Sequence, residues 1–297
     1  MFITVTVPVT LPSKGDVMSI AGQHVHLSTG IDLYYESAGQ GDPSFVFLHG
    51  GGGWSDHWQL QWPVCAALTR VLACDLRGHG RSAAPQGRYT IETFVDDLHA
   101  LLTHLAIQRP ILVGHSLGGT IALRYAFDFP EEVAGLVVVD AGCRAEVATR
   151  EEYRALVVAR VRDFAAASAT LRPYQSSPHS GQAAFVQAVL DATPAPAAGV
   201  IHATHYGIIT HNNAAAAAFV TCPVLVLGAA DMAYWPSIAS WQTYVPHARV
   251  IGIPASGHYL MLEQPAPVNA ALAQFWQEVR AGQGSASEPH ITPPGLF

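Results

Sequence analysis

Six short apolar runs, none with alternating polar residues, most constrain the fold of this chain. They span residues 45–49, 70–75, 110–115, 135–140, 223–228 and 248–253. Runs of this kind are typical of strands that are buried on both faces of a sheet. Helical patterns lie between them, at about 57–68, 91–106, 117–129, 236–244 and 265–280. The alternation predicts an α/β fold with a mostly parallel, doubly wound sheet between two layers of helices.

The pattern also predicts how the chain is divided. Residues 18–142 and 221–280 carry the predicted core, which begins with an alternating β-hairpin between residues 23 and 37. Residues 143–220 show no clear strand but contain alanine-rich stretches with apolar helical faces, so we expect a helical cap over the sheet. We expect residues 1–17 to be an N-terminal extension and residues 281–297 to be a disordered or loosely docked tail.

Composition narrows the class of protein. Half of the 297 residues are apolar and only 12% are charged, as in a well-buried soluble protein. The apolar runs are too short to span a bilayer and residues 1–12 lack the basic region of a secretory signal, so we expect a cytoplasmic protein without membrane contact. The net charge of −7 includes no basic cluster, which argues against nucleic acid as a partner.

The cysteines and histidines form no predicted metal site. Four cysteines lie far apart without metal-ligand spacing, and we expect them to be buried thiols. A histidine cluster at 202–211 fits no common zinc motif. We therefore expect neither a metal nor an organic cofactor. The expected partner is a small-molecule substrate, and the expected assembly is a monomer or a homodimer.

The sequence VGHSLGG at 113–119 is the strongest sign of chemistry in the chain. This G-x-S-x-G element directly follows an apolar run and directly precedes a helical pattern. A serine on such a tight turn has a strained backbone and lies exposed at the carboxyl edge of the sheet. The N-terminus of the next helix favours negative charge that develops beside it. Ser116 is therefore predicted to be a catalytic nucleophile.

With this element and three further motifs, the chain resembles the α/β-hydrolase family from about residue 25 to residue 276. The further motifs are FLHGGGGW at 47–54, DLRGHGRS at 75–82 and ASGHYLMLEQP at 255–265. The resemblance implies an oxyanion hole formed by the backbone N–H groups of Gly51 and Leu117, with Gly52 beside it. For DLRGHGRS it implies structural ion pairs and turn contacts of Asp75 and Arg77.

The family order of nucleophile, acid and histidine assigns the other two catalytic residues. His258 lies in a glycine-containing loop after the last strand and is predicted to be the general base. Asp231 follows the run at 223–228, where the family usually places the acid, and is predicted to orient His258. Asp140, at the end of the preceding strand, is the alternative, because some members use that position.

The remaining predicted contacts concern the substrate pocket. Gly52, Trp54 and Tyr206 are expected to contact the substrate, and the two aromatic side chains to line an apolar pocket for it. Core packing is the expected role of at least half of the four tryptophans at positions 54, 58, 235 and 241.

Together these residues predict a serine hydrolase that cleaves a carboxylic ester or lactone of a small, largely apolar substrate through an acyl-enzyme. Three alternatives stay open. One is a hydrolase of carbon–carbon bonds in ring-cleavage diketones, which uses the same three catalytic residues. The second is a non-hydrolytic lyase or acyltransferase, and the third is a receptor on the same scaffold. Fold resemblance alone does not name the substrate.

Overall fold

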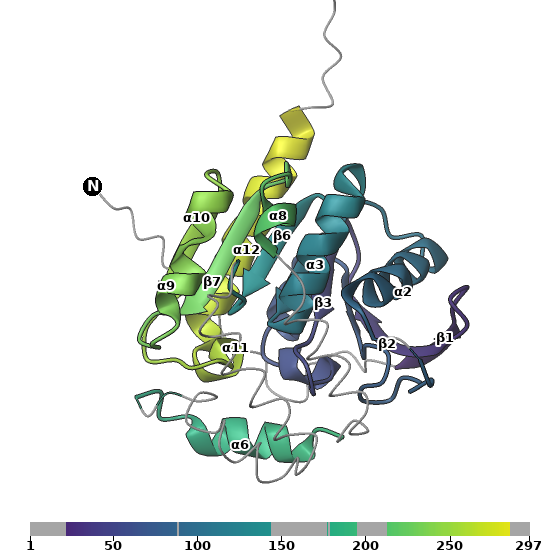
Figure 1. Cartoon of the computed structure of the whole chain (residues 1–297), viewed down its shortest axis with the longest axis horizontal. Coiled ribbons are helices and arrows are strands. Elements are labelled where there is room, and N and C mark those ends of the chain that lie inside the picture. The colour runs from purple at the N-terminus through teal and green to yellow at the C-terminus, as the bar shows by residue number, and fades with distance from the viewer. Residues whose placement is uncertain (1–21, 88, 144–176, 178, 195–212, 286–297) are drawn as a thin grey trace, which may run out of the picture.

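We describe a computed structural model of the chain, which covers residues 22–87, 89–143, 177, 179–194 and 213–285. Within these ranges, eight strands form one sheet in the order β1-β2-β4-β3-β5-β6-β7-β8 (Figure 1). The first two contacts, of β1 with β2 and of β2 with β4, are antiparallel, and all the others are parallel. The strands are β1 (Gln23–His26), β2 (Asp32–Ala38), β3 (Phe45–Leu48), β4 (Val71–Cys74), β5 (Ile111–His115), β6 (Gly135–Val139), β7 (Val224–Ala229) and β8 (Arg249–Ile253).

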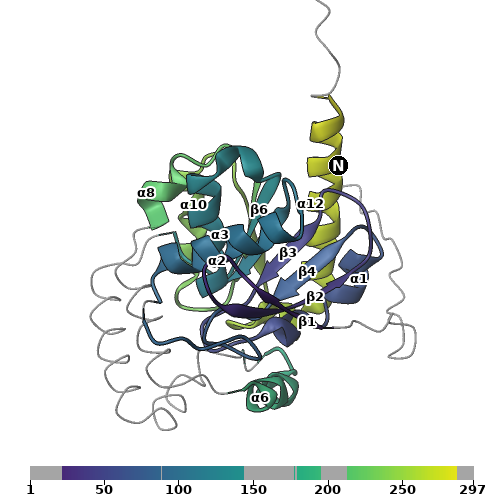
Figure 2. The same cartoon turned by 90° about the vertical axis from the view of Figure 1, so that its right-hand side faces the viewer.

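Helices cover both faces of this sheet (Figure 2). They are the short 3-10 helices η1 (Ser55–Trp58) and η2 (Pro130–Glu132), and the α-helices α1 (Trp62–Ala66), α2 (Ile91–His104), α3 (Leu117–Asp128), α6 (Ala183–Ala192), α8 (Asn213–Ala217), α9 (Trp235–Ala239), α10 (Trp241–Tyr244), α11 (Leu260–Glu263) and α12 (Pro265–Ser285). The predicted α/β class and the mostly parallel sheet are therefore confirmed.

Alternate residues of the central strands enter two separate hydrophobic clusters. In β3, Val46 and Leu48 belong to the cluster that includes side chains of α2, α3, α8 and α10, whereas Phe45 and Phe47 belong to the cluster that includes side chains of α1, α11 and α12. All four side chains are fully buried. Burial of both faces explains why the strands appear in the sequence as continuous apolar runs without alternation.

Several helices differ from the sequence prediction. The pattern at 57–68 corresponds to two short helices, η1 and α1, which are separated by a turn. The short helix α11, directly after the loop of His258, was not predicted. Helix α12 continues to Ser285, so the segment after residue 280 begins as helix and not as a disordered tail. These differences arise because helix ends and short helices depend on tertiary packing more than on local periodicity.

Only part of the predicted cap lies within the described residues. Helix α6 buries Val186 and Val189 in the same cluster as α11 and α12. His57 of η1 also contacts Thr193, directly after α6, with 2.9 Å between Nε2 and Oγ1. The predicted limits of the cap at 143 and 220, and of the N-terminal extension, stay predictions.

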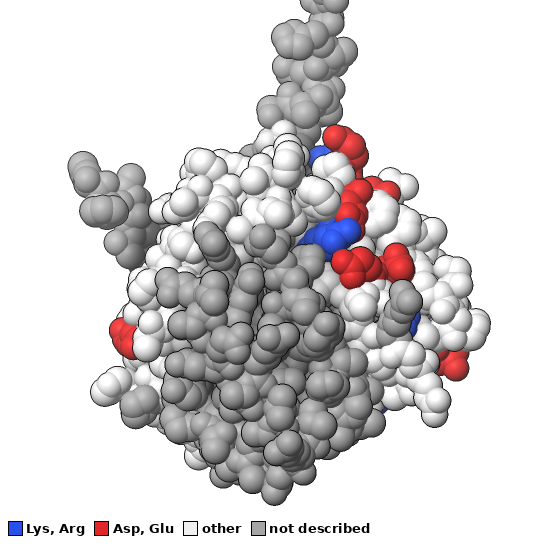
Figure 3. All heavy atoms as spheres, viewed as in Figure 1, with Lys and Arg blue, Asp and Glu red and all other residues white. Residues whose placement is uncertain are grey.

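The described part of the chain contains no helix that is long and apolar enough to cross a bilayer. In the view of Figure 3, the acidic and basic side chains that can be seen are few, and on the upper right they lie next to one another.

The crossing of α3 over the sheet leaves no room for side chains. A Cβ atom on Gly118, in the first turn of α3, would lie 2.2 Å from the carbonyl oxygen of Leu48 in β3. A Cβ atom on Gly114 in β5 would lie 2.1 Å from the oxygen of Gly118. Real Cβ atoms do not approach backbone oxygens so closely, so both positions require glycine. The two glycines bring β3, β5 and the start of α3 into direct contact.

We expect Gly118→Ala to lower the free energy of unfolding by at least about 3 kcal/mol, because the backbone atoms that it would meet cannot move aside. Urea unfolding measures the change. Gly282→Ala in α12 is the matched control, because its Cβ atom would meet nothing within 4 Å. It should leave stability unchanged or raise it by up to about 1 kcal/mol. A Gly118→Ala protein with the parent's urea midpoint would contradict the close crossing.

Candidate active site

Ser116 lies at the turn between β5 and α3 in a strained backbone conformation. Its φ is 51° and its ψ is −112°, a combination that few non-glycine residues adopt. Its N–H donates to the carbonyl of Val139 at 3.0 Å, so the turn is tied to the end of β6. The side chain makes no capping hydrogen bond to α3, and the residue is half-buried. This is the geometry expected of an exposed nucleophile at a helix N-terminus.

The glycine loop after β3 passes directly against Ser116. Gly53 N–H donates to the Gly50 carbonyl at 3.0 Å, which closes a turn around Gly51 and Gly52. The φ of Gly52 is +77°, which a side chain would disfavour. A Cβ atom on Gly50 would lie 3.3 Å from the Cβ of Ser116. The loop thus lies beside Ser116 and beside Leu117, the first residue of α3.

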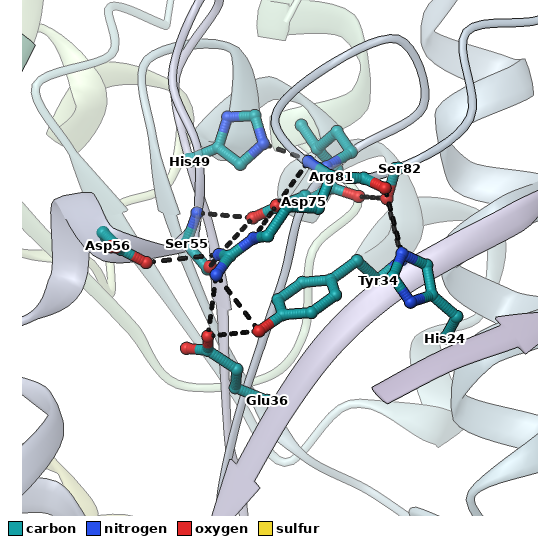
Figure 4. A network of polar contacts seen from close by, with 10 residues as sticks. His24, Tyr34, Glu36, His49, Ser55, Asp56, Asp75, Arg81 and Ser82 are labelled. Atoms are coloured by element: carbon teal, nitrogen blue, oxygen red, sulfur yellow. Dashed lines mark hydrogen bonds and ion pairs between the residues drawn. The ribbon is translucent and has the colours of Figure 1, made fainter. Parts of the chain in front are cut away.

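An ion-pair network anchors the residues that follow the glycine loop (Figure 4). Asp75 Oδ1 accepts a hydrogen bond from Ser55 N–H at 2.8 Å, and Asp75 Oδ2 accepts one from Arg81 Nε at 2.8 Å. Arg81 Nη2 donates to Ser55 Oγ at 2.6 Å. Burial alone would raise the pKa of the Asp75 carboxyl, but the hydrogen bonds that it accepts from Arg81 and from the Ser55 N–H hold the pKa below its ordinary value.

Arg81 also supports Trp54. The Cζ atom of its guanidinium lies over two aromatic rings, 3.8 Å from the ring centre of Tyr34 and 4.8 Å from that of Trp54. These distances are within the range of cation–π attraction. Two further carboxylates, Glu36 and Asp56, face the same guanidinium at 3.0 and 3.2 Å. The predicted structural role of Asp75 is confirmed. Arg77 makes its own buried ion pair with Asp97, as predicted.

His258 is paired with Asp140. The distance from His258 Nδ1 to Asp140 Oδ2 is 2.7 Å, and because a carboxylate can only accept, Nδ1 carries the proton. The Asp140 side chain is completely buried, whereas 28% of the His258 side chain is exposed. Asp140 accepts two more hydrogen bonds, from Ala229 N–H at 3.0 Å and from the Tyr234 hydroxyl at 2.7 Å. The carboxylate is therefore held at both oxygens.

The predicted pairing of His258 with Asp231 is corrected by this geometry. Asp231 is exposed, and its Oδ2 accepts a hydrogen bond from the backbone N–H of Ala255 at 2.7 Å. Asp140 follows β6, the strand next to β5, and has a left-handed φ of 48° while its N–H donates to Leu227 of β7. Asp231 therefore holds the start of the loop that carries His258, and Asp140 holds its imidazole.

Further contacts fix this loop, and the sequence did not identify them. Gly257 N–H, next to His258, donates to Glu263 Oε1 at 2.9 Å. The other oxygen of Glu263 accepts from Ser177 N–H at 2.9 Å. His115 Nε2 donates to the carbonyl oxygen of His258 at 2.8 Å, so the residue before Ser116 contacts the loop directly. Glu263 lies in the same motif as His258, at 255–265. Its place in that motif was the only sign in the sequence that it could contact the His258 loop.

Three buried histidines surround the site in the neutral state. Burial lowers the pKa of His49 and of His57 to about 3, and it lowers the pKa of His115 well below the ordinary 6.5. For His57 the hydrogen bonds also determine the tautomer. The Thr193 hydroxyl donates to the Val189 carbonyl, so it must accept from His57 Nε2–H. These rings are part of the packed wall behind the site and do not carry charge at neutral pH.

The structure thus brings together Ser116, Leu117, His258 and the glycine loop with Gly51 and Gly52, with Trp54 at the end of that loop. Tyr206 lies outside the described residues. Within the described ranges, no group of three or more His, Cys, Asp or Glu side chains could hold a metal ion.

A model of the alpha/beta hydrolase family matches residues 45–271, which is most of the chain. The chain belongs to the alpha/beta hydrolase family. The resemblance inferred from the four motifs is thereby confirmed. The match contains the glycine loop, the Ser116 turn and the His258 loop of this alpha/beta hydrolase.

Curated relatives of this alpha/beta hydrolase are named for different activities. A putative carbamate hydrolase, RutD, of Pantoea ananatis is 29% identical over 273 residues, which cover 88% of this chain and 97% of that protein. The acetyltransferase component of an acetoin-cleaving system of Pseudomonas putida is 35% identical over 130 residues, 44% of this chain and 35% of that protein. The chain spans about a third of the length of this relative and of several others that it matches.

Two solved structures are similar to this alpha/beta hydrolase over nearly their whole length. A thermophilic esterase of Thermogutta terrifontis has a TM-score of 0.77 and 25% identity, and the match covers 87% of this chain and 99% of that one. Est816, described as an N-acyl homoserine lactone degrading enzyme, has a TM-score of 0.75 and 26% identity, with 85% and 100% covered.

The neutral buried histidines predict a pH dependence of stability. The pKa of His57 is lowered to about 3 in the folded protein, from an ordinary value of 6.5. Between these values the unfolded chain binds a proton that the folded protein does not, so stability falls as the pH falls. We expect His57→Gln to reduce the slope of unfolding free energy between about pH 6 and pH 4 by about 1.4 kcal/mol per unit.

Urea unfolding of the parent and the variant at several pH values measures this slope. His104→Gln is the control, because His104 is exposed at the end of α2. Equal slopes for the parent and His57→Gln would mean that His57 is protonated in the folded protein.

Proposed function

We propose that this protein is a serine hydrolase that cleaves a carboxylic ester or lactone through an acyl-enzyme. The observation that carries the proposal is the 2.7 Å hydrogen bond between His258 and the buried Asp140, in a loop that His115 ties to the strained Ser116 turn. A nucleophile, a base and a buried acid on neighbouring loops are the components of acyl transfer.

In the proposed reaction, the Ser116 oxygen attacks the substrate carbonyl carbon while His258 Nε2 takes the hydroxyl proton. Asp140 accepts the Nδ1 proton in a hydrogen bond and stabilises the imidazolium that forms. The carbonyl oxygen becomes an oxyanion, which the N–H groups of Gly51 and Leu117 stabilise. Collapse of this intermediate breaks the ester bond, and His258 returns its proton to the leaving alcohol. Water, deprotonated by the same histidine, then releases the acid.

The comparisons support an ester or lactone as the substrate class. An esterase and a lactone-degrading enzyme are among the solved structures with TM-scores of 0.77 and 0.75. The glycine loop beside Ser116 offers backbone N–H groups without side chains, and the aromatic Trp54 follows it in the chain. We expect these groups to suit a small, largely apolar substrate.

A substrate panel tests this proposal. It contains p-nitrophenyl esters of increasing acyl length, lactones, a p-nitrophenyl carbamate and a vinylogous diketone, ranked by kcat/KM. We expect an ester or lactone to rank first. A diketone in first place would support hydrolysis of a carbon–carbon bond instead. Stoichiometric labelling of Ser116 by a fluorophosphonate without turnover of any substrate would support a receptor or a non-hydrolytic enzyme.

We expect Ser116→Ala to lower kcat by about four or more decades, because the residual catalysis then comes from the oxyanion hole and binding alone. Its unfolding midpoint should stay close to that of the parent. A fluorophosphonate probe should label the parent at Ser116 and leave the variant unlabelled. Ser28→Ala, on the exposed turn of the first hairpin, is the control and should keep full activity and labelling. A Ser116→Ala enzyme with a tenth of the parent's activity would exclude this nucleophile.

The two aspartates form a matched pair for the acid. Asp140→Asn should lower kcat at neutral pH by about three to four decades, because the amide favours the wrong imidazole tautomer. Asp231→Asn should lower it by no more than about tenfold, since within the described residues the hydrogen bond of Asp231 goes to the backbone N–H of Ala255 and not to the imidazole. Steady-state kinetics with the best substrate of the panel measure both. The reverse order would return the acid to Asp231.

A further inference from the structure

The sequence predicted that the loop after β7 supplies the acid, Asp231. In the structure this loop instead supplies the hydroxyl of Tyr234. The Tyr234 hydroxyl donates to Asp140 Oδ2 at 2.7 Å. His258 Nδ1 donates to the same oxygen, also at 2.7 Å. The other oxygen of Asp140 accepts from the Ala229 N–H at 3.0 Å. Tyr234 and His258 therefore share one carboxylate oxygen.

Sharing this oxygen has a defined electrostatic effect. Asp140 is completely buried, so water does not replace a donor that is lost. A hydroxyl that donates to Oδ2 draws negative charge from the oxygen that stabilises the His258 imidazolium. The hydroxyl also fixes the rotation of the carboxylate. Burial, and then the nearby Asp140 charge, raise the pKa of Tyr234 far above 10, so it stays a proton donor at working pH.

We propose that Tyr234 is a positioning residue that lowers the basicity of His258 through the oxygen of Asp140 that the two residues share. The inference rests on the proposed function, since it assigns His258 as the base. Removal of the hydroxyl leaves more charge on Oδ2, stabilises the imidazolium and keeps His258 protonated up to a higher pH. The acidic limb of the profile of Ser116 reactivity against pH then moves toward neutral pH.

Other polar groups face His258 or its loop, and Tyr234→Phe leaves them unchanged. They are His115 from β5, Tyr259 beside the ring, Glu263 from α11 through Gly257 N–H, and Asp231 after β7 through Ala255 N–H. Among the described residues, Tyr234 and His258 are the two whose side chains donate a hydrogen bond to Asp140.

The test measures the rate of phosphonylation of Ser116 by a fluorophosphonate as a function of pH. This probe reports the protonation state of the base without knowledge of the substrate. For Tyr234→Phe we expect the midpoint of the acidic limb to rise by about half a pH unit to one unit. With an ester substrate, kcat/KM should shift in the same way, and KM at the pH optimum should stay within about twofold of the parent. A profile that coincides with the parent's would overturn the proposal.

Tyr125→Phe is a matched control. Its hydroxyl also donates to a carboxylate, that of Glu132 at 2.8 Å, but it does so between α3 and η2. The substitution removes the same kind of hydrogen bond, so it should change stability and leave the pH midpoint where it is. An equal shift in both variants would also overturn the proposal, because it would show a general effect of lost stability.

A second change keeps the test decisive if Tyr234→Phe does not fold. 3-Fluorotyrosine at position 234 retains the hydroxyl and makes it a stronger donor, so it should move the midpoint to lower pH. A shift to higher pH, or no shift, would contradict the inference. Failure of the proposed function has a different signature, since Ser116→Ala would then keep its activity and the parent would not be labelled at Ser116.

Discussion

The contact between the first turn of α3 and the backbone of β3 is the constraint on which the site depends. A side chain on Gly118 would meet the Leu48 carbonyl at 2.2 Å, so only glycine permits this crossing. Leu48 ends β3 and leads directly into the glycine loop. The close packing of α3 on β3 therefore also brings Gly50 against Ser116. The glycine loop and Ser116 are adjacent because two strands and one helix pack without side chains between them.

Hydrogen bonds to backbone groups hold the flexible parts of the site. Asp75 and Arg81 anchor Ser55 after the glycine loop, and Glu263 anchors Gly257 before His258. In a buried setting, a carboxylate without donors is costly, so each of these acids is satisfied by N–H groups. Glycine-rich loops lose much conformational freedom on folding. The fixed geometry of both loops thus depends on charged side chains at their ends.

The aspartates after β6 and β7 both contact the loop of His258, but in different ways. Strand β6 lies between β5 and β7, so the ends of β6 and β7 both reach the loop of His258. Asp140 contacts the imidazole, Asp231 contacts the backbone of the same loop, and Tyr234 from the β7 side contacts Asp140. Residues that follow β6 and β7 therefore both hold His258 in place. The aspartate that contacts the imidazole is the one after β6.

The sequence by itself determined the class of fold, the order of strands and helices, the Ser116 turn and the loop of His258. The fold class, the order of elements and the Ser116 turn follow from local properties, namely apolar runs of strand length, helical periodicity and glycines at a strand-to-helix turn. The loop of His258 was identified through the resemblance to the α/β-hydrolase family. The choice between Asp140 and Asp231 could not be made in this way, because both follow buried strands. It depended on the left-handed backbone at Asp140 and on the direction of each side chain, which only the packed sheet decides. Tyr234 carried no signal in the sequence for the same reason: its contact with Asp140 joins residues 94 positions apart.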